Sequence, residues 1–142
     1  MKSCTFFGHR DTDEEVIPRL KNTILDLIEN KKVDVFYIGN NGNFDLLATE
    51  ILNEATEKYP HISFFVVSAY ERVRLKTVRQ ETIYPLLLKS SLSPIPDRNR
   101  WMVEKSNYVV TYVNRSFGGA SRFKRYALRK QKIVIELNEK KN

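Results

Sequence analysis

Three glycine-bearing segments, each at the exit of an apolar run, carry residue types that can hold an anion. They are Gly8-His9-Arg10, Gly39-Asn40-Asn41-Gly42 and Ser116-Phe117-Gly118-Gly119. Glycine lets a ligand approach the backbone closely, and free N–H groups at the start of a following helix can hold a phosphate. Any one segment alone is better explained as a turn, whereas three of them at one edge of a sheet favour a binding pocket.

Several side chains in or near these segments have two open interpretations. His9 and Arg10 could contact an anion directly, or His9 could cap or pack under its turn, and the sequence favours neither. Asp45 could accept hydrogen bonds from ribose hydroxyls, or serve as an acidic residue at a helix N-terminus. Arg98, followed by Asn99, could bind a phosphate with two N–H groups, or form a local salt bridge of little energetic consequence.

Several common kinds of site are disfavoured. The first segment lacks G-x-G-x-x-G and the chain lacks G-x-x-x-x-G-K-[ST], which argues against a standard dinucleotide site or a P-loop. No Ser-His-Asp order and no pair of carboxylates stands out. One cysteine, Cys4, and two histidines do not make a zinc site, and Cys4 itself is expected in the core. We therefore predict no catalytic residue and no metal, with a nucleotide as the possible cofactor.

The elements that must position these residues alternate between strand and helix. Apolar runs predict strands over residues 3–7, 33–38, 62–67, 107–113 and 133–137, and helical spacing predicts helices over about 14–30, 44–59, 98–105 and 120–130. This order predicts an α/β fold: a single Rossmann-like domain over residues 1–142, with a mostly parallel sheet of five or slightly more strands and helices on both faces. In such sheets ligands bind at the carboxyl ends of the strands.

Two regions give weaker signals. Residues 71–93 fit one helix and a connector, with Pro85 breaking any long helix. Residues 90–97 are rich in serine and proline, and they predict a loop before the helix that carries Arg98.

The chain of 142 residues has a formal net charge of +7, which favours polyanions or phosphorylated ligands. Basic residues concentrate around the Gly118-Gly119 turn, at Arg115, Arg122, Lys124, Arg125, Arg129, Lys130 and Lys132. A solvated helix face is the ordinary explanation for such a run. No apolar run approaches the roughly 20 residues of a membrane span, and the start is a poor signal peptide. We expect a cytoplasmic protein with no membrane partner.

Four motifs taken in order resemble the SLOG superfamily. They are Phe7-Gly8-His9-Arg10, then Gly39-x-x-Gly42-x-Phe44-Asp45-x-x-Ala48, then Arg98-Asn99-x-x-Met102-Val103, and finally Gly118-Gly119 with Tyr126-Ala127. Together they cover nearly the whole chain and are most similar to the YpsA-like branch of bacterial and phage-associated proteins. The resemblance implies a Rossmann-like fold and, because members commonly self-associate, a possible homodimer. It also implies a site for nucleotides, nucleotide-derived ligands or nucleic acid at this edge, since the superfamily includes LOG phosphoribohydrolases and DNA-processing protein A.

One departure from the superfamily bears on catalysis. LOG enzymes carry P-G-G-x-G-T-x-x-E, in which the acid serves glycosidic cleavage, whereas this chain reads Phe117-Gly118-Gly119-Ala120-Ser121-Arg122-Phe123-Lys124-Arg125. The paired glycines remain, and Arg125 stands where the acid would be. The resemblance therefore implies phosphate binding without LOG-type hydrolysis.

Three functions follow from these observations, in order of preference. The first is a sensor or regulatory protein that binds a nucleotide or nucleotide-derived small molecule, with its phosphate at Gly118-Gly119 and paired with Arg98 and Arg10. Asp45 and Asn40 would then contact its sugar or base. The alternative is a nucleic-acid-binding protein that uses the basic face around Arg122 and Arg129, with Tyr112 or Tyr126 for base stacking. Least favoured is a nucleotide N-glycosidase that uses Asp45 or Glu50.

Overall fold

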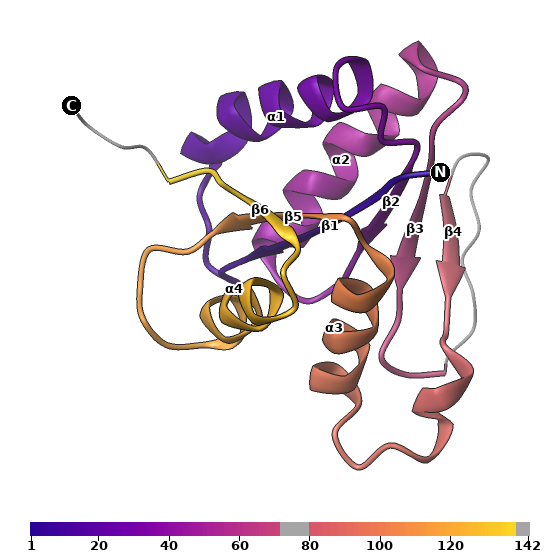
Figure 1. Cartoon of the computed structure of the whole chain (residues 1–142), viewed down its shortest axis with the longest axis vertical. Helices are drawn as coiled ribbons and strands as arrows, with labels where there is room; N and C mark the ends of the chain where they lie inside the picture. Colours follow the sequence, from indigo (N-terminus) through magenta and orange to yellow (C-terminus); the bar gives the residue numbers. More distant parts are fainter. Residues whose placement is uncertain (72–79, 139–142) are drawn as a thin grey trace.

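The structure is a computed structural model of the chain, and it describes residues 1–71 and 80–138. Its centre is one sheet of six strands in the order β4-β3-β2-β1-β5-β6, and every neighbouring pair is parallel (Figure 1). The strands are β1 (Ser3–Gly8), β2 (Val35–Ile38), β3 (Ser63–Val67), β4 (Gln80–Ile83), β5 (Tyr108–Tyr112) and β6 (Ile133–Glu136). The expected Rossmann-like α/β class is confirmed.

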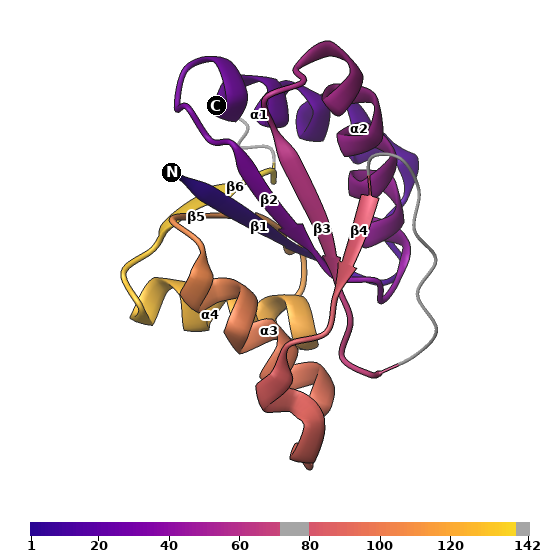
Figure 2. The same cartoon turned by 90° about the vertical axis from the view of Figure 1, so that its right-hand side faces the viewer.

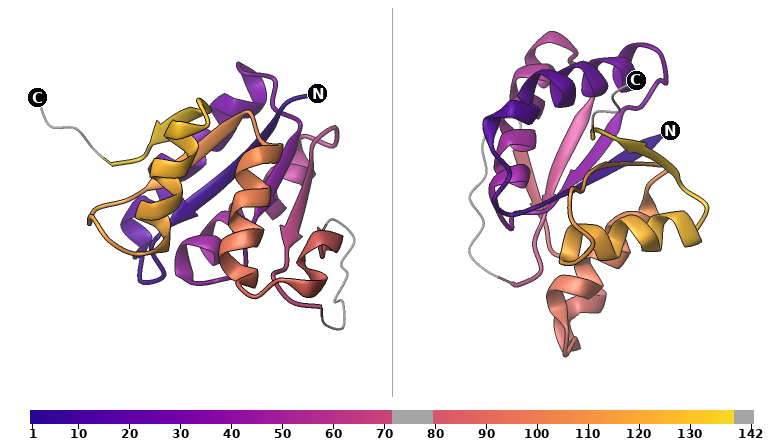
Figure 3. Two further views of the ribbon diagram at one scale, coloured as in Figure 1. Left: turned by 60° about the horizontal axis from the view of Figure 1, so that its bottom comes forward. Right: turned by 90° about the vertical axis from the view of Figure 1, so that its left-hand side faces the viewer.

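Four α-helices cover the two faces of the sheet. They are α1 (Ile17–Glu29), α2 (Asn43–Lys58), α3 (Pro94–Lys105) and α4 (Gly119–Arg129), and short 3₁₀ turns occupy Glu14–Val16 and Leu86–Ser90. Helices α1 and α2 lie on one face, and α3 and α4 lie on the other (Figure 2). Figure 3 shows α3 and α4 side by side across that second face. A parallel sheet needs cover on both faces because each crossover returns over one of them.

The apolar stripes predicted from helical spacing face the core. In α2 the buried stripe includes Phe44, Ala48 and Leu52, which join Phe6 and Phe36 of the sheet in the larger core layer. The smaller layer lies under α3 and α4. Its buried members are Phe7, Val67, Met102, Val103, Val109, Ala120, Phe123 and Ala127. Cys4 is fully buried, as expected for a core cysteine.

Two expectations from the weaker regions need correction. Residues 80–83 form edge strand β4, where a helix and connector were expected; the part of that expectation on residues 72–79 falls outside the described residues. Helix α3 begins at Pro94, four residues before the predicted start at Arg98, because proline is tolerated in a first turn whose N–H groups have no intrahelical partner.

The order of the strands identifies the edge where a ligand would bind. From β1 the chain moves outward to β2 and β3, and it later returns to place β5 on the other side of β1. The carboxyl ends of β1 and β5 therefore flank the topological switch point, where open α/β sheets hold their ligands. Within the described residues, no helix has the length and apolar character required to cross a membrane.

Candidate functional site

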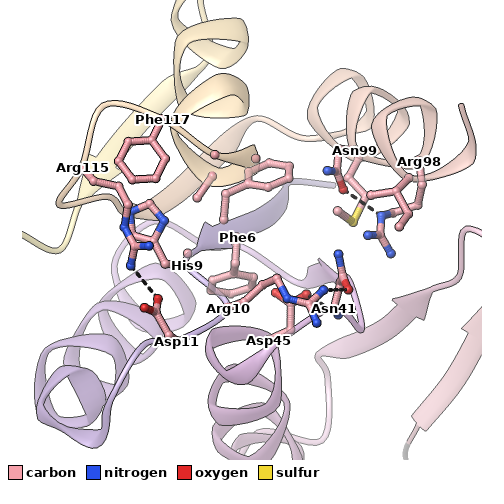
Figure 4. A pocket seen from close by; sticks show the side chains of 17 residues that line it. Phe6, His9, Arg10, Asp11, Asn41, Asp45, Arg98, Asn99, Arg115 and Phe117 are labelled. Atoms are coloured by element: carbon pink, nitrogen blue, oxygen red, sulfur yellow. Dashed lines mark hydrogen bonds and ion pairs between the residues drawn. The ribbon is translucent and has the colours of Figure 1, made fainter.

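A cavity of about 270 Å³ lies at this switch point. Its walls come from the exits of β1, β2 and β5 and from the inner surfaces of α2, α3 and α4 (Figure 4). Eight of the eleven predicted site residues line it, namely Gly8, His9, Arg10, Asp45, Arg98, Asn99, Gly118 and Gly119. The convergence of the first and third glycine segments is therefore present in the structure, and whether these residues bind a ligand stays a prediction.

The first wall follows β1, where Gly8 meets helix α2. A Cβ atom added at Gly8 would lie 2.2 Å from Cγ of Phe44, so this glycine allows the close approach of α2 to the strand. The next residue, His9, is only 6% exposed, and its Nε2 accepts a hydrogen bond from the backbone N–H of Asn114 at 3.2 Å. Nδ1 then carries the proton in the neutral ring, and it is the ring atom that can donate to a ligand.

The environment of His9 favours its neutral form. Burial lowers the pKa of His9, and the nearby Arg115 guanidinium lowers it further, while the Asp11 carboxylate acts in the opposite direction. A neutral ring is also what the Asn114 N–H requires, because a protonated Nε2 could not accept its hydrogen bond. His9 thus packs under the turn and also lines the cavity, so the two interpretations left open by the sequence are compatible.

This arrangement predicts a pH-dependent stability. The unfolded chain protonates His9 near its ordinary pKa of about 6.5, whereas the folded chain does so only at lower pH, so unfolding takes up a proton in that window. We expect the free energy of unfolding to fall as pH drops below about 6.5, with a slope of at most about 1.4 kcal/mol per pH unit. Urea unfolding between about pH 7.5 and 5.5 measures this slope.

The variant His9→Gln should flatten that pH dependence, because glutamine can still accept from Asn114 but does not titrate. His61→Gln, at the exposed histidine on the opposite edge of the sheet, is the control for replacing a histidine as such. If the free energy of unfolding of His9→Gln changed with pH as steeply as that of the unmodified protein, His9 would not be the group responsible for the pH dependence.

A salt bridge between two loops closes one side of the cavity. The Nη2 atom of Arg115, on the loop after β5, lies 2.5 Å from Oδ1 of Asp11, on the loop after β1 (Figure 4). The hydrogen bond from Arg115 lowers the pKa of Asp11, which is therefore ionised at neutral pH. Arg115 also lies over the ring of Phe117, with Cζ 5.7 Å from the ring centroid. An anionic ligand that reached Arg115 would compete with the Asp11 carboxylate.

The opposite side of the cavity is held by Arg98 of α3, whose side chain is 2% exposed. Its Nη1 donates to the carbonyl oxygen of Val67 at 2.9 Å and to Oδ1 of Asn40 at 3.3 Å, and its Nε donates to Oδ1 of Asn99 at 2.7 Å. Burial lowers the pKa of Arg98 and the Asp45 carboxylate opposes that shift, yet a guanidinium stays protonated in proteins. Arg98 thus joins α3 to the ends of β2 and β3.

Asp45 is the acidic residue on this side, and it belongs to the first turn of α2. Its Oδ2 accepts a hydrogen bond from the backbone N–H of Asn41 at 2.9 Å. Burial raises its pKa, while the Asn41 N–H and the charge of Arg98 act to lower it. Gly39 makes this cluster possible, because a Cβ atom there would come within 3.0 Å of Asp45 Oδ2 and 3.1 Å of Arg98 Nη1.

Three predicted residues, Gly39, Asn40 and Gly42, do not line the cavity. Gly39 is buried behind Asp45 and Arg98, and Asn40 is exposed and accepts from Arg98. Gly42 has φ of +122°, and a Cβ there would lie 2.7 Å from Cα of Arg10. The structure thus gives each glycine of the second segment a role within the fold.

Gly118 and Gly119 differ from the other three glycines. A Cβ added at either would meet no atom within 4 Å, so neither is required by close packing. Gly118 has φ of +97°, which suits glycine, whereas Gly119 begins α4 and has no such requirement. The open backbone at the N-terminus of α4 therefore borders the cavity without obstruction, and helix N-termini are favourable positions for anions.

The cavity also contains residues that were not predicted as site residues. Asp11, Asn41, Arg115 and Phe117 contribute polar, cationic and aromatic groups, and the apolar lining comes from Phe6, Phe7, Ile95, Met102 and Ala120. Arg115 belonged to the basic run, and its position three residues before the Gly-Gly pair on a strand exit was the signal that pointed to it. Among the described residues, no group of three His, Cys, Asp or Glu side chains is arranged to hold a metal ion.

Residues named for the less favoured functions lie as follows. Asp45 lines the cavity, whereas Glu50 is exposed on α2 and does not. Tyr112 is half-buried and stacks on Phe44, and the Tyr126 hydroxyl binds Glu104. On α4, Lys124 pairs with Glu136 at 2.9 Å, while Arg122, Arg125 and Arg129 are exposed.

Comparison with known proteins gives structural similarity without sequence similarity. No protein-family model and no curated protein matches the chain. Among solved structures, it is similar to DNA processing protein A (DprA) from Streptococcus pneumoniae, with a TM-score of 0.72 and 13% identity. That alignment covers 96% of this chain and 50% of the other. The chain therefore spans half the length of that protein.

A second solved structure is DprA from Helicobacter pylori, which is described for its mode of binding single-stranded DNA. The TM-score is 0.64 at 16% identity, and the alignment covers 99% of this chain and 67% of the other. At such low identity the two likenesses establish a shared fold. They agree with the Rossmann-like fold expected from the sequence.

Proposed function

We propose that this chain binds single-stranded nucleic acid, with one backbone phosphate in the cavity between the exits of β1 and β5. The phosphate would face the N-terminus of α4 at Gly119, the Arg115 guanidinium and the Nδ1–H of His9. Asp11 would be displaced from Arg115 as the phosphate enters. No catalytic step forms part of this proposal.

The observation that carries the proposal is the open backbone of Gly119 beside a cavity lined by three arginines. Packing explains Gly8, Gly39 and Gly42, but no atom of the described chain lies where a side chain at Gly119 would begin. Close approach of a ligand to the backbone is the remaining reason for glycine there. Peptide N–H groups and guanidinium groups together select an anion.

The size of the cavity favours part of a strand over a whole free nucleotide. Pockets that enclose small ligands usually measure about 300–1,000 Å³, and this one, at about 270 Å³, lies at the lower limit. Exposed arginines outside the cavity, Arg122, Arg125 and Arg129, offer further phosphate contacts along α4. The net charge of +7 and the single-stranded DNA bound by the structurally similar Helicobacter protein support the same class of ligand.

The test is fluorescence anisotropy of a labelled oligothymidylate titrated with the protein at several salt concentrations. We expect binding at about 50 mM salt that weakens steeply toward about 200 mM, with a log–log slope of roughly 0.7 per phosphate contact. Arg115→Gln should weaken binding about tenfold and lower the slope by roughly one contact. The control Lys58→Gln removes the same charge from the far end of α2 and should change binding much less.

No binding of the oligonucleotide at low salt would refute the proposal. Equal effects of Arg115→Gln and Lys58→Gln on the affinity would show that only net charge matters. The oligonucleotide would then not bind at the cavity.

A second candidate keeps the cavity and changes the ligand to a free nucleotide or nucleotide-derived molecule. Asp45 and Asn99 favour it, because their polar groups line the side opposite Arg115 and could contact a sugar or base. Mass spectrometry of small molecules released from the purified protein tests it. A bound nucleotide that resists displacement by oligothymidylate would favour this candidate. With this second candidate we also propose a sensor role like that of the YpsA-like branch, and a homodimer.

A further inference from the structure

A second hollow adjoins the cavity on the side of α3 and α4. It measures about 470 Å³ and lies between the start of α3 and the first turns of α4. Five residues line both spaces, namely Ile95, Asn99, Phe117, Gly118 and Gly119. Because the two spaces share this border, an extended ligand in the cavity can continue into the hollow.

The shared border carries an exposed aromatic ring. Phe117 is 67% exposed on the loop between β5 and α4, and the Arg115 guanidinium lies over its ring. Across the hollow, Ile95 and Pro96 at the start of α3 give a half-buried apolar surface. An accessible ring beside an apolar wall suits a flat base, which can stack on an aromatic side chain whatever its sequence.

The floor of the hollow is cationic. Arg122 and Arg125 line it, both are exposed, and no aspartate or glutamate lines it. Arg125 donates to the hydroxyl of Ser121 at 2.7 Å, and Arg122 lies over the ring of Phe123. Within residues 1–71 and 80–138 neither arginine has an acidic partner, unlike Lys124 on the same helix, which is paired with Glu136.

We propose that this hollow is a second nucleotide subsite, which holds the nucleotide next to the one whose phosphate occupies the cavity. The base of that second nucleotide stacks on Phe117, and its phosphate lies against Arg122 and Arg125. The inference rests on the proposed function and adds to it a direction for the strand, from the end of the sheet along the groove between α3 and α4. The Arg125 position, where LOG enzymes have an acid, becomes a phosphate contact.

The test compares ligands of one and two nucleotides as competitors of a labelled oligothymidylate. Thymidine 5′-phosphate can place its phosphate in the cavity, whereas the 5′-phosphorylated dinucleotide also offers a second nucleotide to the hollow. Stacking of one base is worth about 1–3 kcal/mol, so the second nucleotide should strengthen binding about tenfold in the unmodified protein. Arg125 lines the hollow but not the cavity, so Arg125→Gln should reduce this gain several-fold. Phe117→Ala should weaken binding of the dinucleotide more than binding of the mononucleotide.

Matched variants separate the contributions. Phe117→Leu keeps an apolar side chain without the aromatic face, and should lose most of what Phe117→Ala loses. Lys124→Gln removes one charge from the same helix outside the hollow, and should retain the gain from the second nucleotide.

The outcomes distinguish this inference from the proposed function. If no oligonucleotide binds, the proposed function itself fails. If oligonucleotides bind but the dinucleotide shows no gain, or the gain survives both Arg125→Gln and Phe117→Ala, the strand leaves the cavity by another route and the subsite is refuted. Displacement from the hollow by an acidic peptide that binds more tightly than the dinucleotide would assign the surface to protein and also overturn the inference.

Discussion

Replacing Arg98 with methionine should lower the free energy of unfolding by about 3–5 kcal/mol, because two buried acceptors lose a charged hydrogen-bond donor. The side chain is almost completely buried, and methionine fills much of the same volume. The loss therefore comes from the groups that Arg98 leaves behind. Chemical denaturation, read as the shift in the midpoint at constant slope, measures it.

The groups left without a donor lie on three different elements. The carbonyl of Val67 at the end of β3 loses its guanidinium N–H, as do the side chains of Asn40 and Asn99. Asp45 on α2 loses a nearby positive charge, so the pKa of its carboxyl, which burial already raises, rises further. An unsatisfied buried polar group costs about 1–3 kcal/mol, so the losses at Val67 and Asn99 together reach the expected range, while the exposed Asn40 can accept from water instead.

Two further variants make the result specific. Arg100→Met removes an arginine two positions along the same helix, where it is half-buried and paired with Asp97; such pairs contribute about 1 kcal/mol or less. The double variant Arg98→Met/Asp45→Asn should be less destabilised than the sum of its single changes, because the carboxylate and the guanidinium interact. An Arg98→Met midpoint equal to that of Arg100→Met would refute the structural role.

Much of the fold could be predicted from the sequence because the strong signals come from burial. Strands β1, β2, β3 and β5 are apolar runs between turn residues, because an inner strand of a parallel sheet is buried on both faces. Strand β6, the other edge strand, is also apolar, although its residues are exposed or half-buried. Strand β4 gave no such signal. Its residues Gln80-Glu81-Thr82-Ile83 lie at the edge of the sheet, where one side needs no partner and polar residues are tolerated.

The candidate site could be predicted in part, because the carboxyl ends of parallel strands meet. This rule predicts that Gly8, His9 and the Gly118-Gly119 pair lie together, and all four line the cavity. The salt bridge of Asp11 with Arg115 could not be found in the same way, since the two residues are 104 positions apart and exposed loops carry no periodic signal. Their contact depends on the register between β1 and β5.

The helical spacing of the sequence indicated that Arg98 is buried, although the charge of an arginine suggests the opposite. Arg98 and Asn99 precede Met102 and Val103 by four positions, and residues four apart share a helix face, so both polar residues lie on the core side of α3. An arginine in that position suggests a ligand contact. The structure shows acceptors within the chain for its Nε and Nη1 donors, and this explains how a charged group remains in the core layer. Arg98 also lines the cavity, so its contact with a ligand stays a prediction.

Gly119→Asp should weaken oligonucleotide binding about 100-fold while leaving the protein at least as stable as before. A carboxylate in the first turn of a helix is stabilising by about 0.3–1 kcal/mol, and aspartate has a slightly better helix propensity than glycine. The new Cβ meets no atom within 4 Å, so the backbone at this position leaves room for a side chain to begin. In the complex, that carboxylate would lie beside the phosphate, and like charges in contact cost several kcal/mol.

Thermal unfolding and oligothymidylate anisotropy on the same preparations measure the two effects. Gly119→Asn adds a side chain of the same size without the charge, and should weaken binding less than Gly119→Asp. Gly8→Ala provides the opposite control, because its Cβ would overlap Phe44, and it should destabilise the fold by about 1–3 kcal/mol.

The opposite signs of the two effects make Gly119→Asp informative. A residue that serves only the fold loses binding because it loses structure, so stability and affinity fall together, as expected for Gly8→Ala. A position kept open for a phosphate behaves differently, because the charge that suits the helix excludes the ligand. Full binding by a stable Gly119→Asp protein would show that no phosphate contacts the N-terminus of α4, and would move the ligand away from the cavity.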